Sequence, residues 1–244
     1  MYYYIYDEFV QDKRFEKELF QIENRLTDLG ISGKIGRLAL FKDAAELIRD
    51  EARRGAKTVI FVGNDRTINR ALKVLPELKV TFGILPMGEE ENIYAKILGM
   101  PQGFAACDVI SARIIKPMDI AKVNDRFFLS RVSIPNTRVP LLCEGSYRLA
   151  PTDAGDIEIR NWGRMDKSQN CVGNPEDGLL DLIIEAKLGR KKAGSTDLKL
   201  KFIDIRVKEQ ISIHIDGERV NGNNFKIKIA PSKVRWIVGK ERLF

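Results

Sequence analysis

A change in hydrophobic periodicity near residue 110 constrains the fold of this 244-residue chain more than any other feature. Before that point, continuous apolar runs such as residues 58–62 alternate with helical spacings of three and four, as over residues 15–29. This β-α-β-α order predicts a parallel sheet covered by helices. After it, short stretches that alternate apolar with polar residues dominate, as at 226–229, which is typical of antiparallel sheets. We therefore predict an α/β domain over residues 1–110 and an all-β domain over residues 111–244.

Glycines and turn dipeptides delimit the expected elements. In the first domain we expect strands at 2–6, 35–41, 58–62 and 80–85, and helices at 15–29, 43–54, 67–75 and 90–98. In the second we expect extended stretches at 112–117, 126–133, 157–161, 180–186, 199–206, 210–215, 224–229 and 234–238. The expected turns are Asn124-Asp125, Asp177-Gly178, Asp216-Gly217 and Asn221-Gly222.

The composition is that of an ordinary soluble globular protein, with 44% hydrophobic and 31% charged residues. No apolar run approaches the roughly 20 residues that a membrane span requires, and the N-terminus carries no signal-peptide pattern. We therefore expect a cytoplasmic protein. The three cysteines are far apart and there is one histidine, so neither a disulfide framework nor a zinc site is indicated.

The formal net charge of +7 suits an anionic partner, although solubility alone explains it equally well. Positive charge is densest at Lys187–Lys192, where glycine, serine and threonine neighbours predict an exposed loop. Anionic lipid headgroups would attract this loop, which would place the protein peripherally at a membrane. No aromatic residues are interleaved with the lysines, so nucleic acid is not expected. The oligomeric state stays open, a homodimer included.

Two predicted strands end at or close to a glycine that precedes a helix, at Gly63 and at Gly88. Ligands of parallel sheets bind beyond the carboxyl ends of the strands, and helix N-termini attract anions. The stretch Gly63–Asn69 reads GNDRTIN, in which Thr67 caps the helix or contacts phosphate. On spacing alone, an ordinary capped turn is the preferred explanation of this stretch. After Gly88, three consecutive glutamates would repel a triphosphate unless Mg²⁺ or Arg66 intervened.

Two later acidic turns allow similar pairs of interpretations. At residues 174–181, NPEDGLLD, oxygen atoms of Asn174, Asp177 and Leu179 could bind a hard cation, or the segment is a tight turn that opens a buried strand. The Asp216-Gly217-Glu218 segment reads as a hairpin turn. Glu218 could serve as a general base if it faced the nucleotide site.

In this order, the motifs resemble those of the diacylglycerol kinase catalytic family, which includes bacterial lipid kinases and sphingosine kinases. That family carries a G-G-D-G-T loop, a P-x-G-T-x-N-x-x-A stretch that ends in L-G-I-P, a D-L-G segment, a D-G-x-L-D segment and a late D-G-E. The corresponding segments here are Gly63–Thr67, Pro86–Ala95 with Leu98–Pro101, Asp119–Ala121, Asp177–Asp181 and Asp216–Glu218. The resemblance covers roughly residues 35 to 244.

The resemblance implies an N-terminal Rossmann-like α/β domain followed by an antiparallel β-sandwich domain, as in NAD kinases and diacylglycerol kinases. It also implies ATP and Mg²⁺ as cofactors, a lipid alcohol as acceptor, and transfer of the γ-phosphoryl group. Glu218 would be the catalytic base, and Asp65 would take part in catalysis. Asp119 would belong to an acidic network with Asp65 and Asp216. The nucleotide would contact Gly63, Asn64, Asp65, Arg66, Thr67, Asn69, Gly88 and Asn92, and a structural Mg²⁺ would bind Asp177 with the carbonyls of Asn174 and Leu179.

Several positions depart from the family pattern. Asn64 and Arg66 replace two glycines, Glu89–Glu91 replaces a threonine, and the N-P-x-S-G expected after the first strand is absent. Asn64 tolerates the turn conformation, and Arg66 could supply charge to a phosphate. The segment from Ser133 to Asp177 is too short for the helical insertion that usually shapes the lipid pocket.

Three functional hypotheses follow. The first is an ATP-dependent lipid kinase, or a kinase of another hydroxyl-bearing molecule. The second is a kinase-like binding module that has lost its chemistry and binds a nucleotide, a lipid headgroup or a protein, which the triple glutamate and Arg66 favour. The third, an NAD kinase, fits the Asp216-Gly217-Glu218 and Asp177–Asp181 segments less well.

Overall fold

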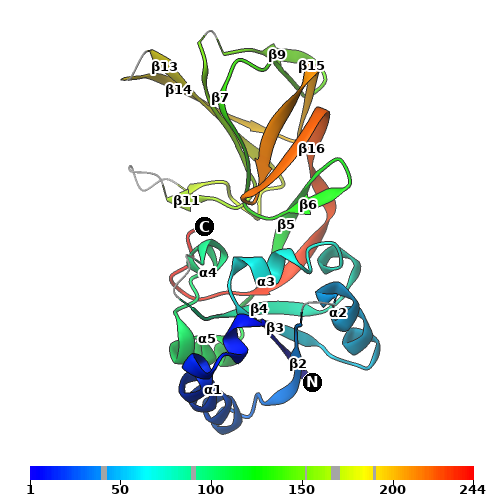
Figure 1. Ribbon diagram of the computed structural model, residues 1–244, viewed down its shortest axis with the longest axis vertical. Coiled ribbons are helices and arrows are strands. Elements are labelled where there is room, and N and C mark those ends of the chain that lie inside the picture. The colour runs from blue at the N-terminus through cyan, green and yellow to red at the C-terminus, as the bar shows by residue number, and fades with distance from the viewer. Residues whose placement is uncertain (40–42, 89–91, 152, 166–170, 189–190) are drawn as a thin grey trace. The chain divides into compact units, whose positions relative to one another are not determined.

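The chain forms two compact units, which are described separately (Figure 1). The first contains Met1–Met118 and Lys233–Leu243, and the second contains Asp119–Ser232 and Phe244. The computed structural model describes residues 1–39, 43–88, 92–151, 153–165, 171–188 and 191–244.

The first unit is built on a parallel sheet in the strand order β2-β1-β3-β4-β16. Every residue of β3 and β4 is buried, as expected for strands that are covered on both faces. Aromatic side chains fill the layer beside β16, where Phe61, Phe82 and Trp236 lie with ring centroids 5.8–6.3 Å apart. The strands are β1 (Tyr2–Tyr6), β2 (Gly33–Arg37), β3 (Thr58–Gly63), β4 (Thr81–Pro86) and the final residues of β16 (Glu218–Ile237).

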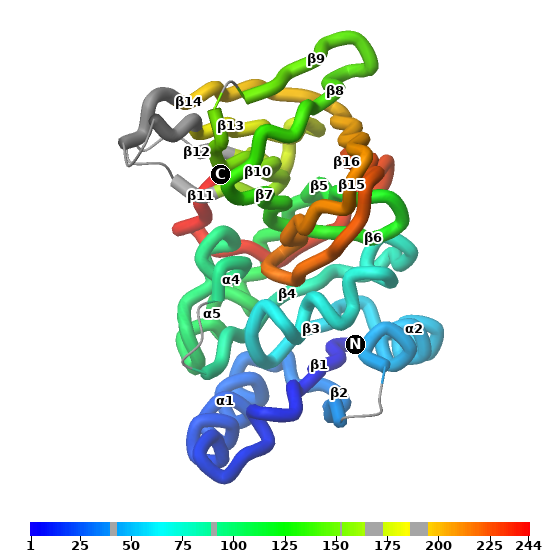
Figure 2. The backbone as a smooth tube through the Cα atoms, turned by 45° about the horizontal axis from the view of Figure 1, so that its top comes forward, coloured from blue at the N-terminus to red at the C-terminus, as the bar shows by residue number. Residues whose placement is uncertain are grey.

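The helices of this unit follow the predicted alternation, and their ends have local causes. Gly30, at φ +66°, follows the C-terminus of α1, and the Asp43 carboxylate accepts a hydrogen bond from the Ala45 N–H at the start of α2. Figure 2 shows α1 beside α5, where Arg25 pairs with Asp108 at 2.5 Å. The sequence did not predict α5. The α-helices are α1 (Glu16–Asp28), α2 (Ala44–Arg53), α3 (Asp65–Asn69), α4 (Ile93–Leu98) and α5 (Ala106–Ala112), and the 3₁₀ turns are η1 (Phe9–Gln11), η2 (Lys13–Phe15), η3 (Leu75–Glu77) and η4 (Gly103–Ala105).

The second unit is antiparallel, with the strand order β14-β13-β10-β7-β15-β16. Shorter strands pair beside this path: β8 pairs with β15 and β9, and β5 pairs with β6. The predicted fold class, a parallel α/β part followed by an antiparallel part, is confirmed. The strands are β5 (Ile115–Val123), β6 (Arg126–Phe128), β7 (Arg131–Thr137), β8 (Leu141–Cys143), β9 (Tyr147–Leu149), β10 (Gly155–Arg160), β11 (Arg164–Met165), β12 (Cys171–Val172), β13 (Leu180–Leu188), β14 (Lys191–Leu200) and β15 (Phe202–Ile215), with the first part of β16.

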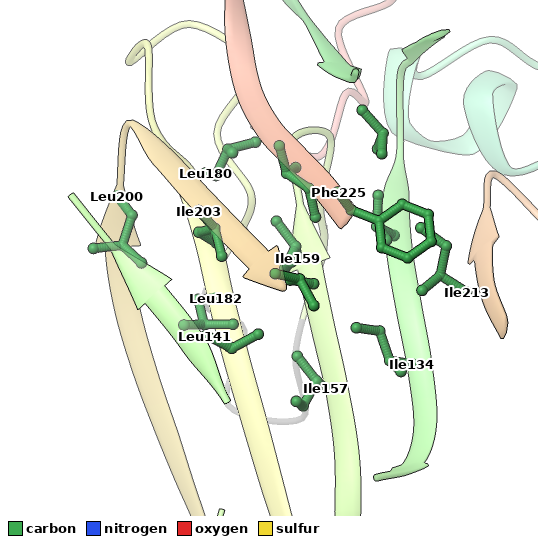
Figure 3. Packing of buried hydrophobic residues seen from close by; sticks show 14 of the residues in the cluster. Ile134, Leu141, Ile157, Ile159, Leu180, Leu182, Leu200, Ile203, Ile213 and Phe225 are labelled. Carbon is green, nitrogen blue, oxygen red and sulfur yellow. The ribbon is translucent and has the colours of Figure 1, made fainter. Parts of the chain in front are cut away.

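An aliphatic core holds the second unit together (Figure 3). Leu180 and Leu182 alternate along β13 with the partly exposed Asp181, so one face of the strand enters this core. Phe225 of β16 packs against the same cluster and is 2% exposed. The period-two pattern in the sequence therefore marks a core that is shared by strands distant in sequence.

Several predicted boundaries are wrong because long strands continue through residues that usually form turns. Asn221-Gly222 lies within β16, where Ser212 pairs with Asn221 and Gly222 lies against Phe225. The stretches 224–229 and 234–238 belong to that same strand. The stretch 199–206 spans two strands, since β14 ends at Leu200 and β15 begins at Phe202, and 126–133 likewise divides into β6 and β7.

The end of the chain returns to the first unit. Sequence analysis assigned residues 111–244 to one all-β domain, whereas Lys233–Leu243 belongs to the first unit. Arg235 and Trp236 of β16 pair in parallel with Thr81 and Phe82 of β4. A single continuous strand thus supplies both an antiparallel and a parallel edge, which local patterning does not reveal.

Candidate functional site

A pocket of about 470 Å³ lies in the first unit at the carboxyl ends of three neighbouring parallel strands. Asp7 follows β1, Asn64 follows β3 and Gly88 follows β4, and all three line the pocket. The carboxyl ends of parallel strands are where open α/β sheets bind their ligands. Its volume lies within the range of small-molecule sites, roughly 300–1,000 Å³. The sequence-predicted residues Asn64, Arg66 and Gly88 line this pocket, and their role in ligand binding stays a prediction.

Within the Gly63–Thr67 loop, the hydrogen-bonding groups of Asn64 and Thr67 bond within the protein. The Asn64 side chain accepts a bond of 3.0 Å from the Arg66 N–H and so caps α3. Thr67 is fully buried; its hydroxyl accepts a bond from the Asn64 N–H and donates one of 2.8 Å to Asp7 Oδ2. A Cβ at Gly63 would lie 2.3 Å from that hydroxyl, which explains the glycine. Thr67 thus connects the ends of β1 and β3 internally.

Asp65 and Asn69 connect α3 to α4. The two carboxylate oxygens of Asp65 accept bonds of 2.8 and 3.1 Å from the N–H groups of Ile93 and Tyr94, the first residues of α4. Asn69 Oδ1 accepts a bond of 2.8 Å from the Tyr94 hydroxyl. A carboxylate at a helix N-terminus is electrostatically favourable. Both side chains, which sequence analysis assigned to the nucleotide, therefore have structural partners in this conformation.

Two arginines and two phenylalanines form much of the pocket wall. Arg66 is exposed and lines the pocket with Arg14, which lies 5.5 Å from the centroid of the Phe15 ring. Phe9 packs edge-to-face on Phe15, with centroids 5.7 Å apart. Asp12 holds the Arg14 segment in place, and the bond from the Arg14 N–H is the main reason that the pKa of this carboxyl lies below its usual range.

Sequence analysis missed Phe9, Arg14 and Phe15. It treated the segment after β1 only as the place where a family motif is absent. Two features of the sequence could have identified this segment as part of a binding site. It directly follows the carboxyl end of a predicted strand, and it contains aromatic and basic residues.

Gly88 and Asn92 flank the start of α4. Gly88 has φ +87°, and a Cβ there would lie 2.9 Å from the Phe9 ring, so only glycine fits without displacing that ring. Asn92 is 6% exposed, and within the described part of the chain neither its Oδ1 nor its Nδ2 has a hydrogen-bond partner. Such burial costs roughly 1–3 kcal/mol. The predicted Glu89–Glu91 segment lies outside the described residues.

In the second unit, Asp216 and Gly217 form the predicted two-residue hairpin turn between β15 and β16, with φ +47° and +89°. Asp216 accepts three backbone hydrogen bonds of 2.8–2.9 Å from residues 129–131. This carboxylate therefore fixes the turn that carries Glu218. Glu218 itself is exposed and forms an ion pair with Arg126, which orients its carboxylate.

Asp119 is 2% exposed and organises a second set of bonds in this unit. Its Oδ2 accepts a bond of 2.8 Å from the Gly178 N–H, and its backbone carbonyl accepts from Asn161 and from Trp162. Asn161 also donates to the Leu129 carbonyl. The carboxylates of Asp119 and Asp216 accept from separate backbone N–H groups, and Asn161 links the backbone carbonyl of Asp119 to that of Leu129. An acidic network that joins these carboxylates with Asp65 stays a prediction.

The turn over residues 174–179 is held by its own polar groups. Asn174 Oδ1 accepts from the Glu176 N–H, and Asp177 Oδ1 accepts from the Leu179 N–H, both at 3.0 Å. The other oxygen of Asp177 lies 2.6 Å from Lys199 Nζ. Within the described residues, no group of three or more acidic, histidine or cysteine side chains is placed to bind a metal ion.

This geometry does not test the predictions about membrane contact and oligomeric state. No helix in the described part of the chain has the length and apolar character needed to cross a bilayer. The basic Lys187–Lys192 segment is a β13–β14 hairpin, with residues 189–190 outside the described part. Membrane contact through it and a homodimer stay predictions.

Comparison with known proteins gives consistent results. The diacylglycerol kinase catalytic domain profile matches residues 2–123, half of the chain. The diacylglycerol kinase of Bacillus subtilis is 28% identical over an alignment that covers 84% of this chain and 85% of that protein. A Klebsiella pneumoniae protein named "probable lipid kinase YegS-like" is 26% identical, with 90% and 91% covered. The crystal structure of a diacylglycerol kinase from Bacillus anthracis shares the fold, with a TM-score of 0.81 and 20% identity over 98% of this chain and 97% of that chain. The chain therefore belongs to the diacylglycerol kinase catalytic domain family.

Proposed function

We propose that this protein is an ATP-dependent lipid kinase that transfers the γ-phosphoryl group of ATP to the hydroxyl group of a diacylglycerol-like lipid. The observation that carries the proposal is the pocket at the carboxyl ends of β1, β3 and β4, with two arginines in its wall. The names of the Bacillus subtilis and Klebsiella pneumoniae relatives support the choice of a lipid acceptor.

The pocket offers groups for the phosphates and for the base of a nucleotide. Arg14 and Arg66 supply guanidinium groups for phosphate oxygens, a pairing that guanidinium geometry favours. The rings of Phe9 and Phe15 offer an aromatic surface for the base. Asn92 lies outside the residues that line the pocket, but its buried amide has no partner within the described part of the chain, and we assign it to the nucleotide as the sequence predicts. Mg²⁺ bound to the ATP would neutralise charge on its phosphates.

Glu218 is the proposed proton acceptor. The lipid hydroxyl oxygen bonds to the γ-phosphorus, the bond from that phosphorus to the β–γ bridging oxygen breaks, and the hydroxyl proton passes to the carboxylate. Arg126 orients this carboxylate, and Asp216 fixes the turn from which it projects.

A second candidate, a kinase-like binding module, is favoured by one specific observation. Asp65 uses both carboxylate oxygens at the N-terminus of α4, and the Thr67 hydroxyl is buried against Asp7. Two groups that sequence analysis assigned to the phosphates are thus engaged elsewhere. This module would bind a nucleotide without transferring its phosphate.

Nucleotide binding is tested by thermal unfolding with and without millimolar MgATP. Saturating nucleotide at about 100 times Kd stabilises the protein by roughly 2.7 kcal/mol, which corresponds to roughly 5–10 °C for a chain of this size. Arg66→Ala is expected to weaken binding about tenfold through the loss of a charge-assisted hydrogen bond. The control, Arg53→Ala, removes an exposed arginine from α2 and should leave binding unchanged. Absence of any shift at millimolar MgATP would refute the kinase and the nucleotide-binding form of the module.

Turnover separates the two candidates. Phosphate transfer from labelled ATP is measured with diacylglycerol in mixed micelles and with a panel of other lipid alcohols. Glu218→Gln should lower kcat by about 10²–10⁴-fold while the nucleotide-induced shift persists. Glu209→Gln, at another exposed glutamate, is the matched control. Binding without transfer to any lipid of the panel would instead establish the binding module.

A further inference from the structure

A cation of the chain itself, the Lys199 ammonium, lies against the turn over residues 174–179. Lys199 lies on β14 opposite Asp181 of β13, and antiparallel partners direct their side chains to the same face of a sheet. Its Nζ is 2.6 Å from Asp177 Oδ2 and 3.9 Å from Asp181 Oδ1. One ammonium group therefore lies against two carboxylates.

These carboxylates are partly withdrawn from water, so they require a nearby positive charge. The Asp177 side chain is 21% exposed and that of Asp181 is 13% exposed, whereas that of Lys199 is 49% exposed. Burial raises the pKa of Asp181, while the Lys199 ammonium, and then a hydrogen bond from the Gly173 backbone, act against this rise. Asp181 Oδ2 has no hydrogen-bond partner among the described residues. The ammonium is thus the main compensating charge that the described geometry provides.

The same atoms do not fit a divalent metal in this arrangement. Mg²⁺ requires near-octahedral oxygen ligands at about 2.0–2.1 Å, and Ca²⁺ requires six to eight oxygens at roughly 2.3–2.6 Å. Asp177 Oδ1 accepts the hydrogen bond from the Leu179 N–H, and Asp177 Oδ2 accepts the one from the Lys199 ammonium. A metal ion and the ammonium cannot both bind at that oxygen, so they are alternative occupants.

We propose that Lys199 replaces a structural divalent cation at the Asn174–Leu179 turn, so that the second unit needs no metal ion to hold this turn. Lysine carries a compact point charge on a flexible stem, which suits such a replacement. The inference does not depend on the proposed kinase activity, because it concerns the fold of the second unit in the absence of ATP.

The test measures thermal unfolding without nucleotide, after chelation, at constant ionic strength, with EDTA, Mg²⁺ or Ca²⁺ present. Wild-type protein should have the same Tm in all three conditions. Lys199→Gln should lower the Tm in EDTA by about 2–4 °C, because two partly buried carboxylates lose their counter-charge. Adding Mg²⁺ or Ca²⁺ should restore part of that loss, because the competing ammonium is gone. Lys201→Gln removes the same charge from an exposed neighbouring position. It should change neither the Tm in EDTA nor the Tm with Mg²⁺ or Ca²⁺.

Two results would overturn the proposal. One is a rise in the wild-type Tm with Mg²⁺ or Ca²⁺ alone that disappears in Asp177→Asn, because a metal would then bind where we place the ammonium. The other is a Lys199→Gln Tm that matches that of Lys201→Gln in EDTA. Neither result involves ATP, so failure here is distinguishable from failure of the proposed kinase activity.

Discussion

Replacing Asp216 by alanine should destabilise the protein strongly, although the residue lies in a surface hairpin turn. Its Oδ1 accepts hydrogen bonds from the Ser130 and Arg131 N–H groups, and its Oδ2 accepts from the Leu129 N–H. Leu129 is fully buried and Ser130 is 6% exposed, so water cannot readily replace the lost acceptor. Asp216 also adopts φ +47°, which aspartate tolerates better than alanine.

The magnitude follows from the number of groups left without partners. Each buried N–H that loses its acceptor costs about 1–3 kcal/mol. Neighbouring losses are not additive. We therefore expect Asp216→Ala to lower the free energy of unfolding by about 3–5 kcal/mol. Asp216→Asn retains one acceptor oxygen and should lose roughly half as much.

Urea denaturation followed by circular dichroism at pH 7 measures this difference. The matched control is Asp125→Ala, in the exposed Asn124-Asp125 hairpin turn, which should change the unfolding free energy by less than about 0.5 kcal/mol. A value for Asp216→Ala within about 1 kcal/mol of wild type would show that these bonds do not hold the turn. The measurement needs no substrate, so it separates the positioning role of Asp216 from chemistry at Glu218.

Three further predictions concern single residues. Asn92→Ala should raise the Tm of the nucleotide-free protein, since it removes a buried amide that has no partner among the described residues. It should also reduce the MgATP-induced shift, and an unchanged shift would remove Asn92 from the proposed site. Asp43→Ala should cost about 0.5–2 kcal/mol at pH 7 through loss of the α2 cap. The hydrogen bond from Lys73, and then that from Ala45, lower the pKa of Asp43 in the folded protein. The stabilisation by this carboxylate is therefore present above the unfolded pKa near 3.8 and is lost as the pH falls through the lower folded pKa. Unfolding free energies of wild type and Asp43→Ala, measured in parallel from pH 7 to 3, should therefore converge. Cys107 is fully buried, and burial raises its pKa to about 11. Alkylation of this thiol at pH 8, followed by mass spectrometry, should therefore be slow in the native protein and rapid in urea. Equal rates would contradict this placement.

Local signals in the sequence were sufficient to predict much of the first unit. Gly30 ends a helix and Asp43 begins one through short-range effects on backbone conformation and capping, so these boundaries can be inferred without tertiary contacts. The Asp216-Gly217 turn was predictable for the same reason. By contrast, Asn221-Gly222 has the composition of a turn but lies inside β16, where pairing with β15 overrides the local preference.

By itself, the sequence determined the change from helical to strand periodicity, the glycine junctions after β3 and β4, and the ordered motifs that indicate the family. Tertiary structure alone decided how the polar groups of those motifs are used. Asp65 binds the N-terminus of α4, Arg14 joins Arg66 in the pocket wall, and Lys199 pairs with Asp177. Propensity and capping act over a few residues, whereas Asp65 and α4, Arg14 and Arg66, and Asp177 and Lys199 are separated by 20 or more positions. Only the packing of the folded chain brings such groups together, and their partners therefore could not be inferred from local pattern.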